Sequence, residues 1–483
     1  MSVTVILTAL TLGAGVGEPV SSAGDPPNQS DTTAGTITAQ YRRAAARIID
    51  STLAGNDGYN KLEELCVGIG HRLSGSPQLD RAVKWAVAAM AADGQENVHP
   101  QPVMVPHWVR GREGVLMLEP RVESLPVLGL GGSVGTTADG ITAEVVVVED
   151  EAGLETLGEG ARGKIVLFNN PMPEYDPEKG SGYGTAVRFR INGPRLAAEY
   201  GAVACLIRSV TANSLRTPHT GVTDYGDAKV KIPAAALTIE DTETIARLFK
   251  RGIRVVVNLQ MGARTLPDTP SANVVGELRG STRPEEVVVI GGHLDSWDAG
   301  HGAHDDAGGC VIAMEAINVL RRLNMIPKRT IRVVLWTNEE NGVRGGKGYA
   351  EAHADELSNH VAAIEADMGV FKPTGFSLQC INETRQAVAL EQMTQIAGLL
   401  EPLGATNMRI GGSGVDIDPM KPAGVVLMGM RVDGSKYFDY HHSPADTIDK
   451  VDPEHLSQNI AALATVAYVI ADMPQRFGES STD

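Results

Sequence analysis

Cysteine is scarce in this sequence of 483 residues, and no stretch beyond the amino-terminal segment is apolar for long enough to cross a membrane. The four cysteines are far apart and form no Cys-x-x-Cys pair; they are Cys66, Cys205, Cys310 and Cys380. This spacing argues against a disulfide framework and against a zinc knuckle. It favours buried free thiols.

Basic residues are also in short supply. The chain has 42 Lys and Arg against 59 Asp and Glu, a formal net charge of -17, which argues against nucleic acid and anionic membranes as partners. The length exceeds that of one small core and predicts two or three domains. The 54 glycines and 26 prolines are typical of a loop-rich α/β protein.

Residues 1–33 have the composition of a signal peptide followed by a disordered spacer. Residues 3–16 are apolar, and Ser21–Ala23 offers the small residues that signal peptidase requires. No Lys or Arg precedes the apolar run, so the usual positive region is missing. We expect a secreted or periplasmic protein; a wrongly assigned start codon and an uncleaved lipid-associated tail are the alternatives.

Composition divides the rest of the chain into two kinds of sequence. Residues 113–268 contain short β-rich runs, two helical patterns and many loop residues, and predict a self-contained β-rich domain. The stretch Thr265–Ser271 has the composition of a linker. The flanking segments 34–112 and 269–476 then form one domain, followed by a tail at 477–483.

Strand and helix patterns alternate after that stretch. Apolar strands are predicted at 286–291, 330–337, 361–365 and 424–430, and helices at 307–323, 346–357, 385–400 and 453–473. This alternation predicts a mostly parallel sheet with helices on both faces. Ligands of such sheets bind beyond the carboxyl ends of the strands.

Metal-ligating residue types stand at these strand ends. A lone His-x-Asp is often a surface feature and a Glu-Glu pair is often a solvated face, so neither indicates a site by itself. Five residues at or near successive strand ends do indicate a metal centre, because clustered ligands outrank isolated motifs. The five are His293, Asp305, Glu340, Asp367 and His442.

The charge of this set favours two metal ions. Three carboxylates and two neutral imidazoles are balanced by two divalent cations and one bridging hydroxide, whereas one cation would leave a buried anionic cluster. Paired cations clamp a carbonyl oxygen and bring a bound water towards a neutral pKa. Nitrogen and oxygen ligands without a thiolate suit zinc, with manganese or cobalt as alternatives.

Two acids beside the ligands have predicted roles of their own. Glu339 precedes Glu340 near a strand end, where adjacent side chains point in different directions. We predict that Glu339 is the general base that takes a proton from the attacking water. Asp295, two residues past His293, is predicted to accept the other imidazole N–H with its carboxylate, and a solvent-facing Asp295 is the alternative.

With these residues in view, the chain resembles the co-catalytic zinc aminopeptidase and glutamate carboxypeptidase family, and within it the carboxypeptidase Q subfamily. The similarity runs from about residue 41 to about residue 473 and includes segments outside the site, such as Arg72–Ser76 and Pro218–Gly221. The motifs that carry it are Gly292-His293-Leu-Asp-Ser-Trp-Asp298, Asp305-Asp306, Asn338-Glu339-Glu340, Glu365-Ala-Asp367 and His441-His442-Ser-x-x-Asp446-Thr447.

The resemblance implies a zinc exopeptidase fold, an α/β protein whose mostly parallel mixed sheet lies between helices. Residues 113–268 would be an inserted β-rich protease-associated domain. The five ligands named above would hold two Zn²⁺, with Asp305 bridging and Glu339 as the catalytic acid/base. Wider relatives carry Tyr where this chain has His441, so we expect His441 or nearby Tyr440 to donate to the oxyanion.

The resemblance also implies a substrate and a quaternary state. Ser413 and Gly414 match a substrate loop of the glutamate carboxypeptidases and would line the pocket, but the basic residues that those enzymes use for glutamate are not securely matched. The expected substrates are dipeptides or short peptides with free ends, and the expected assembly is a homodimer. No nucleic acid and no integral membrane segment are expected.

Two other functions stay open at this point. A single-zinc acyl-transfer enzyme, as in glutaminyl cyclases, would keep the fold but not need a bridging Asp305. A receptor-like interaction protein would have a dead site, whereas all five ligand positions and Glu339 are intact here. Fold does not by itself fix function.

Overall fold

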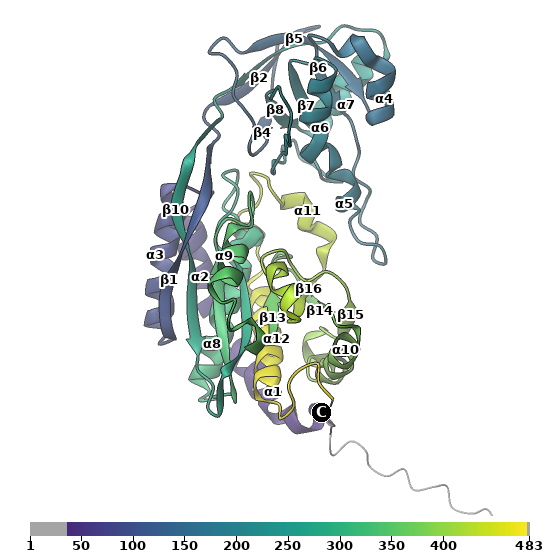
Figure 1. Cartoon of the computed structure of the whole chain (residues 1–483). Coiled ribbons are helices and arrows are strands. Elements are labelled where there is room, and N and C mark those ends of the chain that lie inside the picture. The colour runs from purple at the N-terminus through teal and green to yellow at the C-terminus, as the bar shows by residue number, and fades with distance from the viewer. Residues whose placement is uncertain (1–35, 481–483) are drawn as a thin grey trace, which may run out of the picture.

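Two eight-stranded sheets dominate the computed structural model, which describes residues 36–480 (Figure 1). The predicted signal peptide and spacer at residues 1–33 lie outside the described residues, as do the last three residues of the predicted tail. Within residues 36–480, no helix combines the length and the apolarity needed to cross a bilayer.

The first sheet is mixed and has a parallel centre. The four central strands β12, β11, β13 and β16 are parallel, and the pairs β1–β10, β10–β12 and β16–β14 are antiparallel. In spatial order the strands are β1 (Glu96–Val109), β10 (Arg264–Leu278), β12 (Arg329–Trp336), β11 (Arg283–His293), β13 (His360–Glu365), β16 (Val426–Val432), β14 (Pro373–Gln379) and β15 (Asn407–Ile410). The predicted mixed α/β fold is confirmed.

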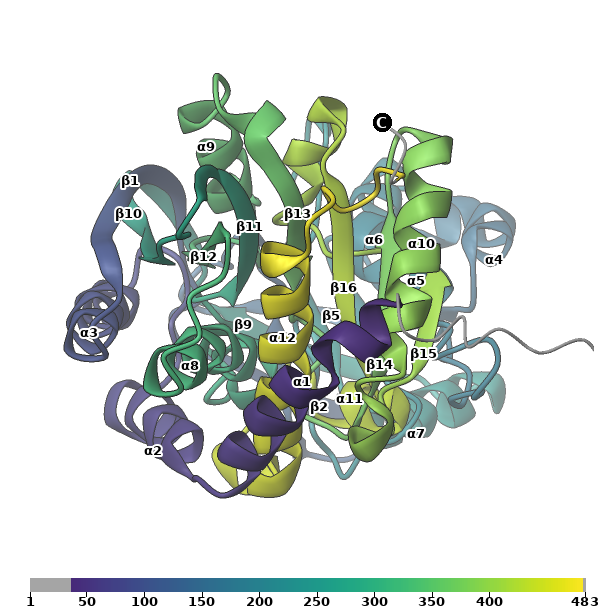
Figure 2. The same cartoon turned by 90° about the horizontal axis from the view of Figure 1, so that it is seen from below.

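Helices cover both faces of this sheet (Figure 2). Alternate residues of β11 explain the two layers, since Val288 and Ile290 pack in one hydrophobic cluster and Val287 and Val289 in another. The first cluster includes α8, α12 and α1, and the second includes Tyr349 of α9. The main helices are α1 (Ile37–Leu53), α2 (Asp57–Glu63), α3 (Pro77–Ala92), α8 (Gly308–Arg322), α9 (Arg344–Ala352), α10 (Glu383–Ala397) and α12 (Pro453–Asp472).

Residues 113–261 form a second unit around the second sheet, with two hydrophobic clusters, one of which also includes Leu73, Trp108 and Trp297 of the first unit. The strands in order are β3 (Glu123–Leu125), β2 (Glu113–Glu119), β9 (Val256–Met261), β5 (Ile141–Val148), β6 (Ile165–Phe168), β7 (Ala204–Arg208), β8 (Ala234–Leu237) and β4 (Val127–Gly129). Its helices are α4 (Glu151–Leu157), α5 (Tyr183–Ala186), α6 (Arg188–Glu199) and α7 (Ile239–Lys250).

A two-stranded ribbon of β1 and β10 joins the second unit to the first sheet (Figure 1). The prediction of a linker at Thr265–Ser271 is therefore wrong, because these residues belong to β10 and pair with β1. Only Val274–Leu278 of β10 also pairs with β12, so Pro267 and Pro270 lie where the outer edge of β10 has no strand partner. A proline there breaks no ladder hydrogen bond on that edge.

The four cysteines are buried and free, which confirms the prediction from their spacing. Strands β14 and β15 were not predicted. Proline, glycine and polar residues interrupt Pro-Thr-Gly-Phe-Ser-Leu-Gln of β14, and polar residues interrupt Asn-Met-Arg-Ile of β15, so that neither shows a continuous apolar run. Pairing with β16 and with each other supplies the order that local propensity does not.

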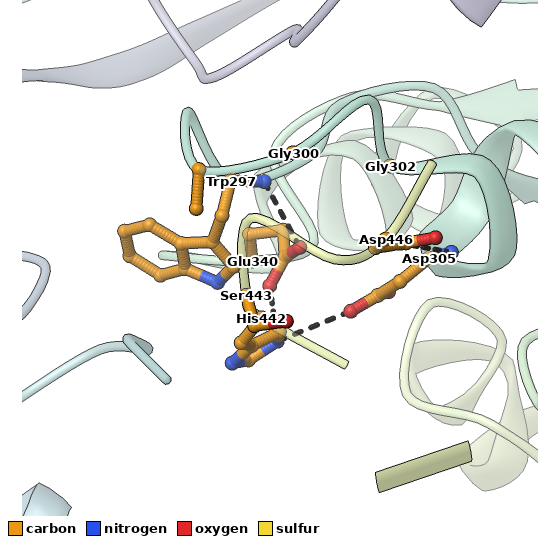
Figure 3. Close-up of a pocket in the computed structure, with 9 residues that line it drawn as sticks. Trp297, Gly300, Gly302, Asp305, Glu340, His442, Ser443 and Asp446 are labelled. Atoms are coloured by element: carbon orange, nitrogen blue, oxygen red, sulfur yellow. Dashed lines mark hydrogen bonds and ion pairs between the residues drawn. The ribbon is translucent and has the colours of Figure 1, made fainter. Parts of the chain in front are cut away.

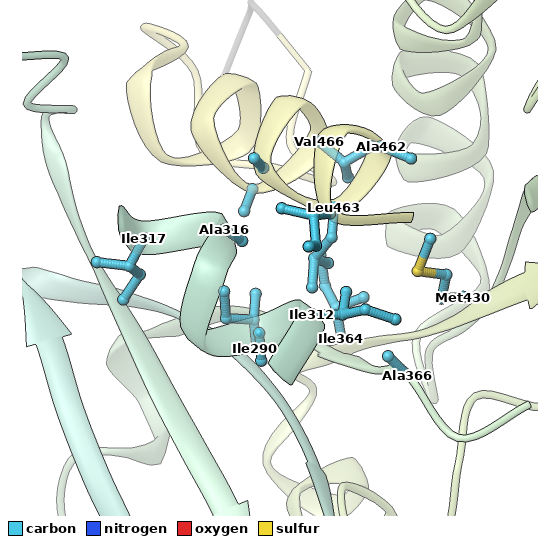
Figure 4. Packing of buried hydrophobic residues seen from close by; sticks show 14 of the residues in the cluster. Ile290, Ile312, Ala316, Ile317, Ile364, Ala366, Met430, Ala462, Leu463 and Val466 are labelled. Carbon is cyan, nitrogen blue, oxygen red and sulfur yellow. The ribbon is translucent and has the colours of Figure 1, made fainter. Parts of the chain in front are cut away.

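Leu463 of α12 tests the packing of the main core, where it lies near Ala316 and Ile312 of α8 (Figure 4). The change Leu463→Ala keeps helix propensity but leaves a cavity, so we expect the free energy of unfolding to fall by about 2–5 kcal/mol in urea unfolding. Leu53→Ala on α1 is the matched control, because Leu53 is 44% exposed. Equal losses for both variants would contradict this assignment of the core.

Candidate metal centre and catalytic cleft

The predicted ligands converge at the carboxyl ends of neighbouring parallel strands. His293 is the last residue of β11, Glu340 follows β12, and Asp367 follows β13. Asp305 lies in the turn Ala303–Ala307 in front of α8, and His442 follows α11 (Tyr437–Tyr440). Because β12, β11 and β13 are adjacent and parallel, their ends bring these side chains to one place.

Asp305 stands between two His–carboxylate pairs. Its Oδ1 lies 3.2 Å from His293 Nε2, and its Oδ2 lies 3.2 Å from His442 Nε2. His293 Nε2 is also 3.4 Å from Asp367 Oδ1, and His442 Nε2 is 3.0 Å from Glu340 Oε2. Figure 3 shows His442 directed at both Glu340 and Asp305. The arrangement is two half-sites that share one carboxylate.

These atoms fit metal ions better than they fit one another. Three carboxylates meet here, and two of their oxygens, Asp305 Oδ2 and Asp367 Oδ1, are buried and accept no hydrogen bond. Burial and the Asp305 carboxylate raise the pKa of Glu340 to about 7. Although burial opposes it, the Glu340 and Asp305 carboxylates raise the pKa of His442 to about 9. Without a cation the cluster takes up protons, and a cation would displace them.

Backbone carbonyls orient both imidazoles. Nδ1 lies 3.2 Å from Thr220 O in His442 and 3.0 Å from Asp295 O in His293. A carbonyl oxygen only accepts, so the contact with Asp295 O makes Nδ1 the protonated nitrogen of neutral His293 and leaves its Nε2 lone pair for a cation. Thr220 belongs to the second unit, and so does Arg190, whose Nη1 lies 3.3 Å from the same Nδ1 of His442, so the second unit holds the ring of one candidate ligand.

The predicted contact of the Asp295 carboxylate differs from the observed one. The carboxylate Oδ1 lies 3.7 Å from His293 Nδ1, and the backbone carbonyl of the same residue takes the closer position. The carboxylate instead accepts hydrogen bonds from the backbone N–H groups of Glu339 at 3.0 Å and Glu340 at 3.4 Å. Asp295 is buried, so the solvent-facing alternative is also wrong. Its carboxylate positions the two glutamates.

Two further carboxylates hold the ligand backbone in the same way. Asp446 accepts from the N–H groups of Ala303 at 3.1 Å, His304 at 2.8 Å and Asp305 at 3.1 Å. Asp306 Oδ2 accepts from His293 N at 3.0 Å. Sequence reasoning did not assign these roles, although both residues stand inside the recognised motifs.

Glu339 faces a cleft of about 640 Å³ that Asp305, Glu340, Asp367 and His442 also line. Burial and the nearby Asp367 carboxylate raise the pKa of Glu339 well above its ordinary value. A carboxylate with a raised pKa is a better proton acceptor, and such groups concentrate at functional sites.

His441 lies against the same centre. Its ring stacks on that of His442 at 3.5 Å between centroids, and its Nε2 lies 3.7 Å from Asp305 Oδ2. Burial and the neighbouring His442 hold the pKa of His441 well below its ordinary value. Tyr440, the alternative donor, stacks its ring on His304 and is not among the residues that line the cleft.

Ser413 and Gly414 line a neighbouring pocket of about 430 Å³ that includes Asp367. Gly414 has φ +122°, and a Cβ there would come within 2.3 Å of Glu365 Oε2. Sequence reasoning missed Tyr437, and it missed Tyr183 and Arg190 of the second unit, which line the main cleft. No sequence signal placed these last two residues, since they lie far from the motifs along the chain.

The chain is similar to known proteins over nearly its whole length. Residues 273–467 match the model of peptidase family M28. Carboxypeptidase Q from Mus musculus is 43% identical over 92% of this chain and 92% of its own length. Carboxypeptidase Q from Homo sapiens is 43% identical over 88% of both chains.

The chain belongs to peptidase family M28. Within the family it belongs to the carboxypeptidase Q subfamily, which confirms the resemblance found in the sequence. A solved M28 peptidase precursor from Shewanella amazonensis is 36% identical, has a TM-score of 0.86 and covers 91% of this chain and 98% of that one.

A zinc aminopeptidase from Bacillus subtilis shares the fold of this M28 peptidase. It is 19% identical, has a TM-score of 0.62 and covers 88% of this chain and 97% of that one. Family membership, together with the cluster of His, Asp and Glu side chains, makes this chain a metallopeptidase.

Asp446→Asn tests the support of Asp305 in this M28 peptidase. An amide cannot accept at both of its terminal atoms, so the three N–H groups around Asp305 lose part of their anchor. We expect the affinity for zinc to fall by about 10- to 100-fold, measured by competition with a chromogenic chelator. Asp449→Asn is the control, because Asp449 is exposed and does not contact the ligands. Unchanged affinity would contradict the proposed support.

Proposed function

We propose that this M28 metallopeptidase is a di-zinc exopeptidase that hydrolyses dipeptides or short peptides. One observation carries the proposal: Asp305 offers one carboxylate oxygen to each of two His–carboxylate pairs. His293 and Asp367 would hold one ion, and His442 and Glu340 the other. Zinc suits this donor set, with manganese or cobalt as alternatives.

A bound zinc pair supplies Lewis-acid polarisation of the scissile carbonyl and lowers the pKa of the attacking water. The chain supplies proton transfer. Glu339 lies in the cleft beside Glu340 and Asp367, and its raised pKa suits a group that takes the proton of the water and passes it to the leaving amine. The Asp295 carboxylate positions Glu339 through its backbone N–H.

His441 is our candidate for the donor to the developing oxyanion. Its lowered pKa keeps the imidazole neutral near pH 7, so one ring nitrogen carries a hydrogen. Stacking on His442 holds the ring beside Asp305. A fixed N–H donor at this place would stabilise the tetrahedral intermediate without reorganisation.

Ser413 and Gly414 would contact the substrate in the pocket beside Asp367. Residues 113–268 would be a protease-associated domain that caps the cleft and shapes it, because pockets form where domains meet. Export of the protein and assembly into a homodimer rest on the amino-terminal composition and on the resemblance. Single-zinc acyl transfer is disfavoured, since Asp305 reaches both half-sites.

Glu339→Gln tests the proton transfer. We expect peptidase activity on a dipeptide panel to fall by roughly 100-fold or more, because the amide cannot take a proton. Metal analysis should still find about two ions per chain, because Glu339 is not a ligand. Glu351→Gln, a change at an exposed residue of α9, is the matched control. A Glu339→Gln enzyme of full activity, or a wild-type enzyme without metal, would refute the proposal.

His441→Phe tests the oxyanion donor. Phenylalanine keeps the stack on His442 but has no N–H, so we expect kcat to fall by about 10²- to 10³-fold with little change in KM. Steady-state kinetics on a dipeptide measure both constants, and His455→Phe on the surface of α12 serves as control. Unchanged turnover would remove His441 from the mechanism.

A further inference from the structure

Val343 has a backbone conformation that its side chain opposes. Its φ is +54° and its ψ is +32°, in the left-handed region. Within residues 36–480 it is the only Val, Ile or Thr with a positive φ. A β-branched side chain crowds the backbone in this region, so the conformation is strained. Strain of this kind is concentrated at functional sites, where the side chain has a task that outweighs it.

The position is also unfavourable for the start of a helix. Val343 is the N-cap of α9, and its side chain makes no capping hydrogen bond. Asn and Gly suit an N-cap and also tolerate the left-handed region, whereas Val does neither. Two local preferences are therefore violated at one residue, and such violations are typical of functional positions.

Core packing does not account for this valine. Val343 is only partly buried, and none of the four hydrophobic clusters among residues 36–480 includes it. The neighbouring Gly342 has a different cause, since a Cβ there would come within 2.3 Å of Asn338 Oδ1. The turn thus carries a branched side chain at a position where its backbone favours glycine, and no core requires that side chain.

Val343 meets the main cleft instead of a core. It lines this cleft together with Glu339, Met368 and Val415. Met368 is 43% exposed and Val415 is 41% exposed, so the cleft contains further apolar side chains that the fold leaves uncovered. Binding sites for small substrates are lined mainly by such groups, because they take apolar parts of the ligand out of water.

The turn that joins Glu339 to Val343 indicates which part of the substrate is nearby. Val343 N donates to Glu339 O at 3.4 Å, so the two residues close a single turn of the chain. Glu339 is the group that we assign to proton transfer to the leaving amine. The Cα of the leaving residue is bonded to that nitrogen, so its side chain begins two bonds from the point of proton transfer.

We propose that Val343 binds the side chain of the residue that follows the scissile bond and makes the enzyme selective for an apolar residue there. This rests on the proposed peptidase function and names a substrate class for it, short peptides with an apolar residue on the leaving side. The strained backbone is retained because the isopropyl group contacts the substrate.

The test measures kcat/KM of the zinc-loaded full-length enzyme for dipeptides that share their first residue and carry Gly, Ala or Leu as the second. The wild type should favour Leu over Gly by about 10-fold or more, the usual scale for apolar contacts in a pocket. Val343→Asn is close to Val in size but polar, so the Leu-to-Gly ratio should fall by about 10-fold. Val343→Gly should lower the same ratio, because the contact is absent.

Thermal unfolding separates substrate contact from a structural role. Asn and Gly relieve the strain and suit the N-cap, so the Tm of Val343→Asn and of Val343→Gly should equal or exceed that of the wild type. A lowered Tm together with equal losses on all dipeptides would show that Val343 serves the fold, and would overturn the proposal. If either variant does not fold, the Leu-to-Gly ratio of Val343→Ala decides.

Asn324→Gly is the matched control for a change at a left-handed residue. Asn324 has φ +52°, is exposed and is not among the residues that line the cleft. This change should leave the Leu-to-Gly ratio at the wild-type value. A shift of the ratio in this control equal to that of Val343→Gly would remove the assignment to Val343.

Failure of this inference differs from failure of the proposed function. A wild type that cleaves no dipeptide removes both, whereas one that cleaves Gly and Leu dipeptides equally keeps the peptidase function and removes the apolar site. A reversed series, in which the first residue varies, identifies the side of the scissile bond. Val343 variants that change only the reversed series would assign the contact to the other residue and contradict the proposal.

Discussion

Mutual repulsion of carboxylates is the constraint around which the centre of this molecule is built. Asp305, Glu340 and Asp367 converge with two imidazoles at the end of a parallel sheet, where Asp305 and Glu340 are buried and only weakly screened by water. The groups that fix their positions are themselves acids: Asp295, Asp306 and Asp446 each bind backbone N–H groups beside a ligand. This double layer of negative charge is stable only with cations or protons inside it, so a bound metal would contribute to the stability of the folded state.

The second unit takes part in the centre through its backbone. His219 Nδ1 lies 2.8 Å from His441 O, Thr220 N donates to His442 O at 2.9 Å, and Thr220 O faces His442 Nδ1. These contacts fix a loop of the first unit that lacks regular structure at His442, whose φ is +59°. One histidine of the site is therefore held by both units, and the cleft exists only where they meet.

Sequence reasoning could group the five predicted ligands because His293, Glu340 and Asp367 follow a regular rule, the carboxyl ends of parallel strands. It could not reach Arg190 and Tyr183, because the contact of Arg190 with His442 joins residues about 250 positions apart through the packing of two sheets. For His293 the prediction named the right residue but another group of it. The carbonyl oxygen of Asp295, and not its carboxylate, lies closest to His293 Nδ1. The prediction of a linker at Thr265–Ser271 rested on its prolines and polar residues. Pairing with β1, which the local sequence does not reveal, makes this segment part of a strand.

The paired ribbon also bears on how such a protein can change in evolution. The chain leaves the first sheet along β1 and returns along β10, and Val109 and Arg264 face each other at the point where the second unit begins. A short hairpin at that pair would close the sheet without the unit, so gain or loss of the whole unit in a lineage is a change at one site on a sheet edge. A descendant shortened in this way would keep its ligands in sequence and lose the carbonyl of Thr220 that orients one of them. Such a descendant would need another partner to hold that imidazole.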